Sequence, residues 1–153
     1  MLEQLIKRLE KEGKLLKQKS GFVQVEALLK EAIADLSEAK KIQDIAERAT
    51  YLLAYMGMLK AGRALLLFKG YRPADGAQHK TVVEVTSAML GERYADLTTH
   101  FELMRRKRNE MTYEASGLLS MSEAKEAFVD ATALVTQILA EIKAFNPQLD
   151  LKF

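Results

Sequence analysis

The stretch AERATYLLAYMGMLKAGRALLLFKGYRP, residues 46–73, decides the fold of this chain. Most of it belongs to a long helix, predicted over about 42–69, that is apolar nearly all round. A helix with two apolar faces lies at the centre of a bundle or contributes to a dimer interface, and we favour the central position. One apolar seam contains Ile42, Ile45, Ala49, Leu52, Met56, Leu59 and Leu66, and a second stripe contains Tyr51, Tyr55 and Met58.

Other periodic segments predict further helices, over about 2–18, 23–38, 77–90, 92–115 and 120–145. The segment GYRPADG at 70–76 has the turn residues Pro73, Asp75 and Gly76 and is predicted to be a loop. Gly117 is expected to stop the helix before it. Ser120 and Glu123 have the spacing of a capping box, which predicts the start of the last helix.

The fold class follows from these elements. No window shows convincing alternation with a period of two, so we expect an all-α protein. Short connections favour antiparallel neighbours and hence an up-and-down helical bundle, with the first helix as an extra N-terminal element. A chain of 153 residues is long enough for one domain, 1–153, and hardly for two.

Composition sets limits on the class of protein. Hydrophobic residues make up 48% and charged residues 29% of the chain, which is ordinary for a folded domain and unlike disorder. The absence of cysteine excludes disulfides and thiolate metal sites and fits a reducing compartment. The apolar runs are shorter than the ~20 residues of a membrane span, and the charged N-terminus lacks a signal-peptide block. We therefore expect a cytoplasmic protein without a membrane segment.

Positive charge is clustered although the net charge is small. A net charge of +2 does not by itself indicate a nucleic-acid binder. Charge runs are usually solvated helix faces, so the clusters need further evidence before they indicate a ligand. The two clusters are Arg105, Arg106, Lys107 and Arg108, and Lys11, Lys14, Lys17 and Lys19.

One residue of the first cluster falls where the core is expected. In the predicted helix 92–115, a seam of residues spaced alternately by three and four is apolar or aromatic except at Arg108. An unpaired buried guanidinium costs several kcal/mol, so Arg108 should be paired, line a cleft or face a polar partner. The seam comprises Tyr94, Leu97, Phe101, Met104, Arg108, Met111, Ala115 and Leu118.

The neighbours of Arg108 make it a candidate phosphate ligand. Arg105, Arg108, Asn109 and Thr112 are linked by steps of three and four, and Tyr113 lies one turn beyond Asn109. A guanidinium matches two phosphate oxygens at once, so a guanidinium, an amide and a phenol together suit a phosphodiester or a nucleotide. The alternative is that Arg108 lies at the helix end and pairs with a carboxylate such as Glu47 or Glu110.

A second candidate group begins the predicted helix 77–90. His79 and Lys80 follow the GYRPADG segment and lie near Arg72 in sequence. Because a helix start favours anions, these side chains would complete a phosphate site near Arg108. The alternative is a histidine that caps the helix or packs on Tyr71.

Arg63 interrupts the seam of the long helix, as Arg108 interrupts the other seam. Two arginines that face one region repel each other unless an anion or a carboxylate, such as Glu47 or Glu84, lies between them.

His100 falls outside its seam and is expected to be partly exposed. The sequence has no metal-ligand spacing, phosphate-binding glycine loop or serine–histidine–acid set, so neither a metal nor a cofactor is expected.

RNEMTYE, residues 108–114, resembles the signature of HEPN domains, in which an arginine is followed after four to six residues by a histidine. Arg108 matches the arginine, Asn109 matches the polar residue that often follows it, and Tyr113 stands where the histidine would be. The long helix with its GYRP end, followed by AQHKTVVE at 77–84, resembles a bacterial HEPN branch. The resemblance covers roughly residues 22–145 and leaves the first helix as an extension.

The resemblance implies a bundle of four to five helices, usually dimeric, with motifs from two protomers facing one cleft. Many HEPN proteins are metal-independent ribonucleases of toxin–antitoxin or defence systems, some with a nucleotidyltransferase-like partner, and others bind RNA or nucleotides without cleavage. The arginine would steady the phosphate, but a tyrosine titrates near pH 10 and is a poor base at pH 7. We expect RNA or nucleotide binding with ribonuclease activity as an extension; the alternative is a non-catalytic helical dimer that serves as an interaction or antitoxin-like module. The dimer is expected to bury part of the stripe Tyr51, Tyr55 and Met58.

Overall fold

The computed structural model describes every residue except 75–77, 114–117, 150 and 152–153. The described residues form six α-helices, one 3-10 helix and a small two-stranded sheet. In chain order the elements are α1 (Leu2–Lys11), β1 (Leu15–Lys17), α2 (Phe22–Ile42), α3 (Glu47–Phe68), β2 (Tyr71–Pro73), α4 (Gln78–Leu90), η1 (Glu92–Tyr94), α5 (Ala95–Tyr113) and α6 (Met121–Phe145).

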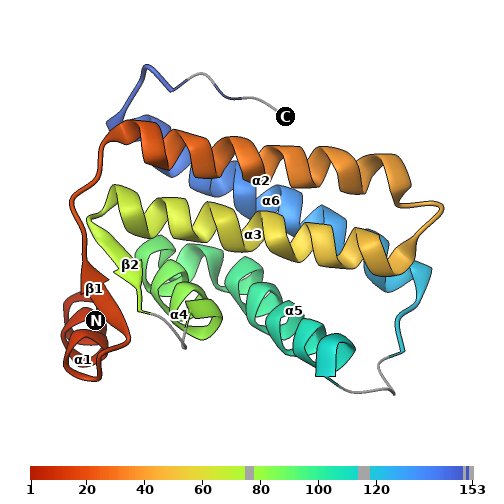
Figure 1. Cartoon of the computed structure of the whole chain (residues 1–153), viewed down its shortest axis with the longest axis horizontal. Coiled ribbons are helices and arrows are strands. Elements are labelled where there is room, and N and C mark those ends of the chain that lie inside the picture. Colours follow the sequence, from red (N-terminus) through yellow and green to blue (C-terminus); the bar gives the residue numbers. More distant parts are fainter. Residues whose placement is uncertain (75–77, 114–117, 150, 152–153) are drawn as a thin grey trace.

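The helix α3 lies at the centre of the bundle, as its two apolar faces predict. It packs against α2 and α6 along one side and against α4 and α5 on the other (Figure 1). Its sequence places small or apolar side chains on nearly every face, so it finds a partner helix in each direction. The predicted all-α helical bundle is confirmed.

The second apolar stripe of α3 belongs to the core and not to an outer surface. Tyr51, Tyr55 and Met58 are all buried inside the protomer. A dimer interface built on this stripe is therefore wrong. In the predicted first seam, Leu52 and Met56 are half-buried, whereas Ile45 precedes α3 and is exposed.

Two glycines let neighbouring helices approach α3 closely. A methyl group at Gly62 would lie 2.8 Å from Cγ1 of Val82 and 2.9 Å from Oγ1 of Thr86, both on α4. At Gly57 it would lie 3.1 Å from Cγ of Leu36 on α2. The approach at Gly62 is the tighter one, and it sets how near α4 comes to the aromatic side chains of α3.

The N-terminal part of the chain departs from the prediction. The helix expected over 2–18 ends at Lys11, and the expected loop 70–76 contains a strand. Gly13 has a φ of 73°, which turns the chain out of the helix, and β1 then pairs antiparallel with β2 in the register Leu16 opposite Arg72. Strands of three residues are too short to show the alternation that identifies a strand.

The predicted motif lies at the last turn of α5, shortly before the first turn of α6. The capping box is confirmed: Oγ of Ser120 accepts a hydrogen bond from the backbone N–H of Glu123 at 3.0 Å. The guanidinium of Arg48 on α3 donates to the carbonyl of Met111 at 2.8 Å and fixes the last turn of α5. Asp75, Gly76, Ala115 and Gly117, to which the sequence assigned turn or seam positions, lie outside the described residues. Leu118, the last predicted seam residue, lies beyond α5 and is exposed.

By length and composition alone, α3 would be able to cross a membrane, because its 22 residues include an 18-residue window of mean hydropathy 1.3. The uninterrupted apolar runs within it are nonetheless short, because Arg48, Lys60 and Arg63 divide the helix. Most of that window is buried against the other helices, which is the position of a core helix in a helical bundle.

Candidate functional site

Arg108 lies half-buried on α5, between the sealed core and open solvent. Its Nη1 donates to Oδ1 of the neighbouring Asn109 at 3.3 Å. Among the residues described here, no carboxylate lies within ion-pair distance of Arg108, so the pairing with Glu47 or Glu110 considered above is absent from the structure. Its charge remains available to an anion.

Arg105, one turn earlier on α5, is already engaged. Its Nε and Nη2 donate to the two carboxylate oxygens of Glu102 at 3.0 and 2.6 Å, and Arg106 adds a contact to Glu102 at 3.1 Å. The Arg105 hydrogen bonds hold the pKa of the Glu102 carboxyl below its usual range, and the same pair raises the pKa of Arg105. Any role of Arg105 toward a ligand therefore competes with Glu102.

Tyr113 is placed differently from Arg108. It is the last described residue of α5, and 78% of its surface is exposed. Thr112 beside it donates its hydroxyl to the carbonyl of Arg108 at 2.9 Å, which ties this turn together. The sequence placed Tyr113 beside Arg108 in a cleft, whereas the structure shows an exposed phenol at the helix end.

His79 at the start of α4 meets a buried tyrosine of α3. The hydroxyl of Tyr55 lies 2.9 Å from Nδ1 of His79, and the two rings stack with centroids 5.7 Å apart. Tyr55 also packs on Phe101 of α5, with ring centroids 6.0 Å apart. Three helices thus converge on the Tyr55–His79 pair, which the sequence did not single out.

Three guanidiniums act on this imidazole. Burial lowers the pKa of His79 below 6.5, and the positive charges of Arg108, Arg105 and Arg63 lower it further. Burial raises the pKa of Tyr55, although Arg105 and Arg108 oppose that effect, so Tyr55 stays a phenol. His79 is therefore neutral at pH 7. The Tyr55 hydroxyl and Nδ1 of this neutral imidazole share a hydrogen bond, and the tautomer of the ring decides which of the two donates.

The other predicted cations lie around this pair. Arg63 is exposed on α3, not in its seam, and together with Arg72 of β2 it lines a small pocket of about 180 Å³. Lys80 is exposed on the first turn of α4. The structure thus brings His79 together with Arg63, Arg105 and Arg108, and places Arg72 next to Arg63.

The fold matches a known structure. A crystal structure of an archaeal HEPN homologue resembles this chain with a TM-score of 0.59, covering 78% of this chain and 98% of that chain. This chain has a HEPN-like fold. The two sequences are 21% identical, so the likeness establishes the fold and leaves the roles of individual residues to the geometry described above. No family model and no curated protein sequence matches the chain significantly.

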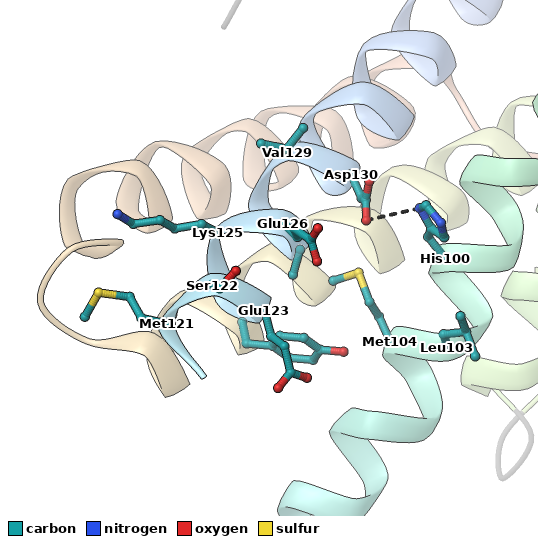
Figure 2. Close-up of a pocket in the computed structure, with 12 residues that line it drawn as sticks. His100, Leu103, Met104, Met121, Ser122, Glu123, Lys125, Glu126, Val129 and Asp130 are labelled. Carbon is teal, nitrogen blue, oxygen red and sulfur yellow. Dashed lines mark ion pairs between the residues drawn. The ribbon is translucent and has the colours of Figure 1, made fainter. Parts of the chain in front are cut away.

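A larger groove lies between α5 and α6 in this HEPN-like fold. It has a volume of about 890 Å³ and separates α5 from the first half of α6 (Figure 2). Leu103 and Val129 on its walls are 56% and 63% exposed, and Met104 forms part of its buried floor. Nδ1 of His100 lies 3.1 Å from Oδ2 of Asp130 across it. The sequence predicted the exposure of His100 but not this pairing or the groove.

Proposed function

We propose that this HEPN-like protein binds RNA or a nucleotide through phosphate groups at the site between α3, α4 and α5. The observation that carries the proposal is the half-buried guanidinium of Arg108, which donates to Asn109 and whose charge acts with those of Arg105 and Arg63 on the imidazole held by Tyr55. Such charges repel one another, and a bound phosphate would relieve that repulsion. Arg108, which has no carboxylate partner among the described residues, is the cation best placed for this role.

Each residue would contribute a different interaction. The guanidinium of Arg108 would bind two phosphate oxygens, as its planar donor geometry allows. Nε2 of His79 would donate a hydrogen bond when it carries the ring proton, with the ring oriented by Tyr55. The amide of Asn109, now an acceptor for Arg108, would turn toward the ligand. Arg105, Arg63, Arg72 and Lys80 would supply the surrounding positive charge.

We propose ribonuclease activity of a metal-independent, toxin–antitoxin or defence type only as an extension of binding. Cleavage requires a base for the 2′-hydroxyl of RNA, and the exposed Tyr113 is a weak base at pH 7. The geometry therefore supports binding more strongly than cleavage. Within the described residues no group of histidine and carboxylate side chains has the arrangement of a metal site.

Titration of fluorescent single-stranded RNA and of a nucleoside triphosphate tests the proposal. We expect saturable binding that weakens as salt is raised, because phosphate contacts release counterions. RNA cleavage is measured in the presence of a chelator, with the wild type and with Tyr113→His. Cleavage that rises with Tyr113→His would support a catalytic motif, and absence of binding to either ligand would contradict the proposal.

The groove beside α6 favours a second candidate function, a non-catalytic dimer or an antitoxin-like interaction module. Exposed Leu103 and Val129 in a groove of about 890 Å³ offer apolar surface that a protein partner would cover. We propose a cytoplasmic homodimer, with a nucleotidyltransferase-like protein as a further partner. Sedimentation at about 50 μM tests the dimer, whose interface should bury at least ~1,200 Å². A monomer at that concentration would contradict it.

A further inference from the structure

The pocket that contains Arg63 and Arg72 is built by the short sheet. The strand β2 is held against β1 in a fixed register, and the chain continues the pairing where the N–H of Gln18 donates to the carbonyl of Gly70 at 2.9 Å. Gly70, with a φ of 94°, makes the tight turn from α3 into β2. This turn brings Arg72 back beside Arg63 on α3, although the two are nine positions apart in sequence.

The lining of this pocket fits an anion. Its described polar side chains come from Arg63, Arg72, Gln18, Gln78 and Tyr71, and none of the described lining residues is a carboxylate. Leu28, Leu67 and Pro73 complete the walls. Two guanidiniums at one cavity repel each other, and an anion between them would remove that cost and accept hydrogen bonds from both.

The volume selects the size of the ligand. The pocket measures about 180 Å³, which is the liquid volume of roughly six water molecules. That space takes a phosphate group but is below the ~300 Å³ at which pockets for whole small-molecule ligands begin. A nucleoside attached to this phosphate would therefore lie outside the pocket.

The pocket adjoins the site of the proposed function. Arg63 lines the pocket, and its charge also lowers the pKa of His79. Gln78, which precedes His79 in the chain, is part of the lining. The site at Arg108 and His79 and the pocket at Arg63 and Arg72 thus share Arg63 and the first turn of α4.

We propose that the pocket between α3, β2 and the start of α4 is a second phosphate-binding subsite, and that the two subsites together hold successive phosphates of a single-stranded RNA. The assignment to RNA rests on the proposed function, whereas the binding of a phosphate group does not. A mononucleotide would occupy only one subsite, so the second subsite would make a polynucleotide the preferred ligand.

The first arm of the test uses inorganic phosphate and isotope-labelled protein. We expect the guanidinium Nε–H signals of Arg63 and Arg72 to shift saturably with phosphate and not with chloride at equal ionic strength. Arg72→Ala should weaken the response at Arg63 about ten-fold or more, since it removes charge-assisted hydrogen bonds. Arg63→Lys, which keeps the charge but not the planar donors, should weaken the response at Arg72 by less than ten-fold. Signals that do not respond to phosphate would overturn the subsite.

The second arm compares a short single-stranded RNA with a mononucleotide. Arg72→Ala should weaken RNA binding about ten-fold and reduce the magnitude of the salt slope by ~0.7, and it should weaken mononucleotide binding less than RNA binding. The matched control is Arg93→Ala, which removes an arginine that stacks on Tyr94 away from the pocket. RNA binding by Arg72→Ala equal to that of the control would overturn the role of the subsite in RNA binding. If the pocket arginines respond to phosphate but the wild type binds no RNA, the subsite stands for free phosphate and the proposed function fails.

Discussion

The two sides of α5 offer opposite chemistry. Toward α3 and α4, the charges of Arg105 and Arg108 act together with that of Arg63 on a half-buried imidazole, and Arg63 also lines a small pocket. Toward α6, a groove about five times larger is lined by exposed apolar side chains and by the carboxylates of Glu123, Glu126 and Asp130. Figure 2 shows these carboxylates along the same stretch of α6 as Val129.

The larger of these two cavities is therefore not the one whose residues suit a phosphate. Carboxylates repel phosphates, so the larger groove is a poor surface for a nucleic acid. Apolar walls with an acidic rim instead suit a protein surface with basic and apolar side chains. A single helix thus keeps an anion site and a protein-docking surface apart, and variants on each side should affect different partners.

The largest effect is expected from Arg108→Ala. Loss of its charge-assisted contacts should weaken RNA or nucleotide binding by ten-fold to a hundred-fold, from ~1.5–3 kcal/mol per contact. Stability should change by less than ~1 kcal/mol, because no carboxylate partner of Arg108 is stranded among the described residues. Binding titrations and thermal melts measure the two effects.

The matched control lies on the other side of α5. Glu126→Gln removes one carboxylate of the groove and should leave RNA binding within about two-fold of the wild type. If Arg108→Ala instead loses ~3–5 kcal/mol of stability and binds normally, Arg108 is a structural cation and the two faces do not differ in function.

The sequence was sufficient for the bundle, since periodic apolar seams reveal helices and the capping box marked the start of α6 within one residue. It was not sufficient for β1 and β2, because the pairing of Leu16 with Arg72 depends on a contact between distant parts of the chain. Periodicity alone also does not predict whether the second apolar stripe, formed by Tyr51, Tyr55 and Met58, is buried inside one protomer. A second apolar stripe is equally consistent with a neighbouring helix and with a second protomer.

The candidate site was predicted in part. His79, Arg63, Arg105 and Arg108 were identified from seam interruptions and helix position, and the structure brings them together. Tyr55 was missed because a tyrosine in an apolar stripe is indistinguishable from a core residue until its hydroxyl is seen to meet His79. A signal was present nonetheless, since a buried tyrosine needs a hydrogen-bond partner.

Gly62→Ala tests how α4 is positioned against α3. The added methyl group would lie 2.8 Å from Cγ1 of Val82, so overpacking should cost ~1–3 kcal/mol, offset by up to ~1 kcal/mol of helix propensity. We expect a net loss of about 1–2 kcal/mol in urea denaturation, together with weaker anion binding as His79 shifts. Gly57→Ala is the control, because its closest contact, 3.1 Å, is to the side chain of Leu36 on α2. Equal effects of the two substitutions on anion binding would contradict a positioning role for Gly62.

Ser120→Ala should perturb the start of α6, which lines the groove, and leave the arginine site intact. It removes the 3.0 Å hydrogen bond to the N–H of Glu123 at the first turn of α6, which should cost about 1 kcal/mol. Because the first turn of α6 forms part of the groove, partner binding there should weaken while RNA affinity stays the same. The free energy of unfolding from chemical denaturation and the RNA titration check both expectations. A parallel loss of RNA binding would show that the two faces are coupled.

The smallest effect concerns the protonation of His79. Burial and the charges of Arg108, Arg105 and Arg63 disfavour its imidazolium in the folded protein, so between the lowered pKa and 6.5 the unfolded chain binds more protons. The contribution of His79 to stability is therefore complete above pH 6.5 and is lost as pH falls from 6.5 through the lowered pKa. Urea denaturation at pH 7.5 and pH 5.5 should show a larger loss for the wild type than for His79→Asn.

An NMR titration of the His79 imidazole resolves the cause. Its pKa should lie below 6.5 in the wild type, rise in Arg108→Ala, and stay unchanged in Arg93→Ala, which lies away from the three guanidiniums. Tyr55→Phe removes the hydroxyl that hydrogen-bonds with Nδ1 and should alter the ratio of the two neutral tautomers. A phosphate bound among the arginines would favour the imidazolium, so the pKa of His79 should also rise when phosphate is added. A pKa that responds neither to Arg108→Ala nor to phosphate would remove His79 from the anion site, and the basic face of α5 would then rest on Arg108 alone.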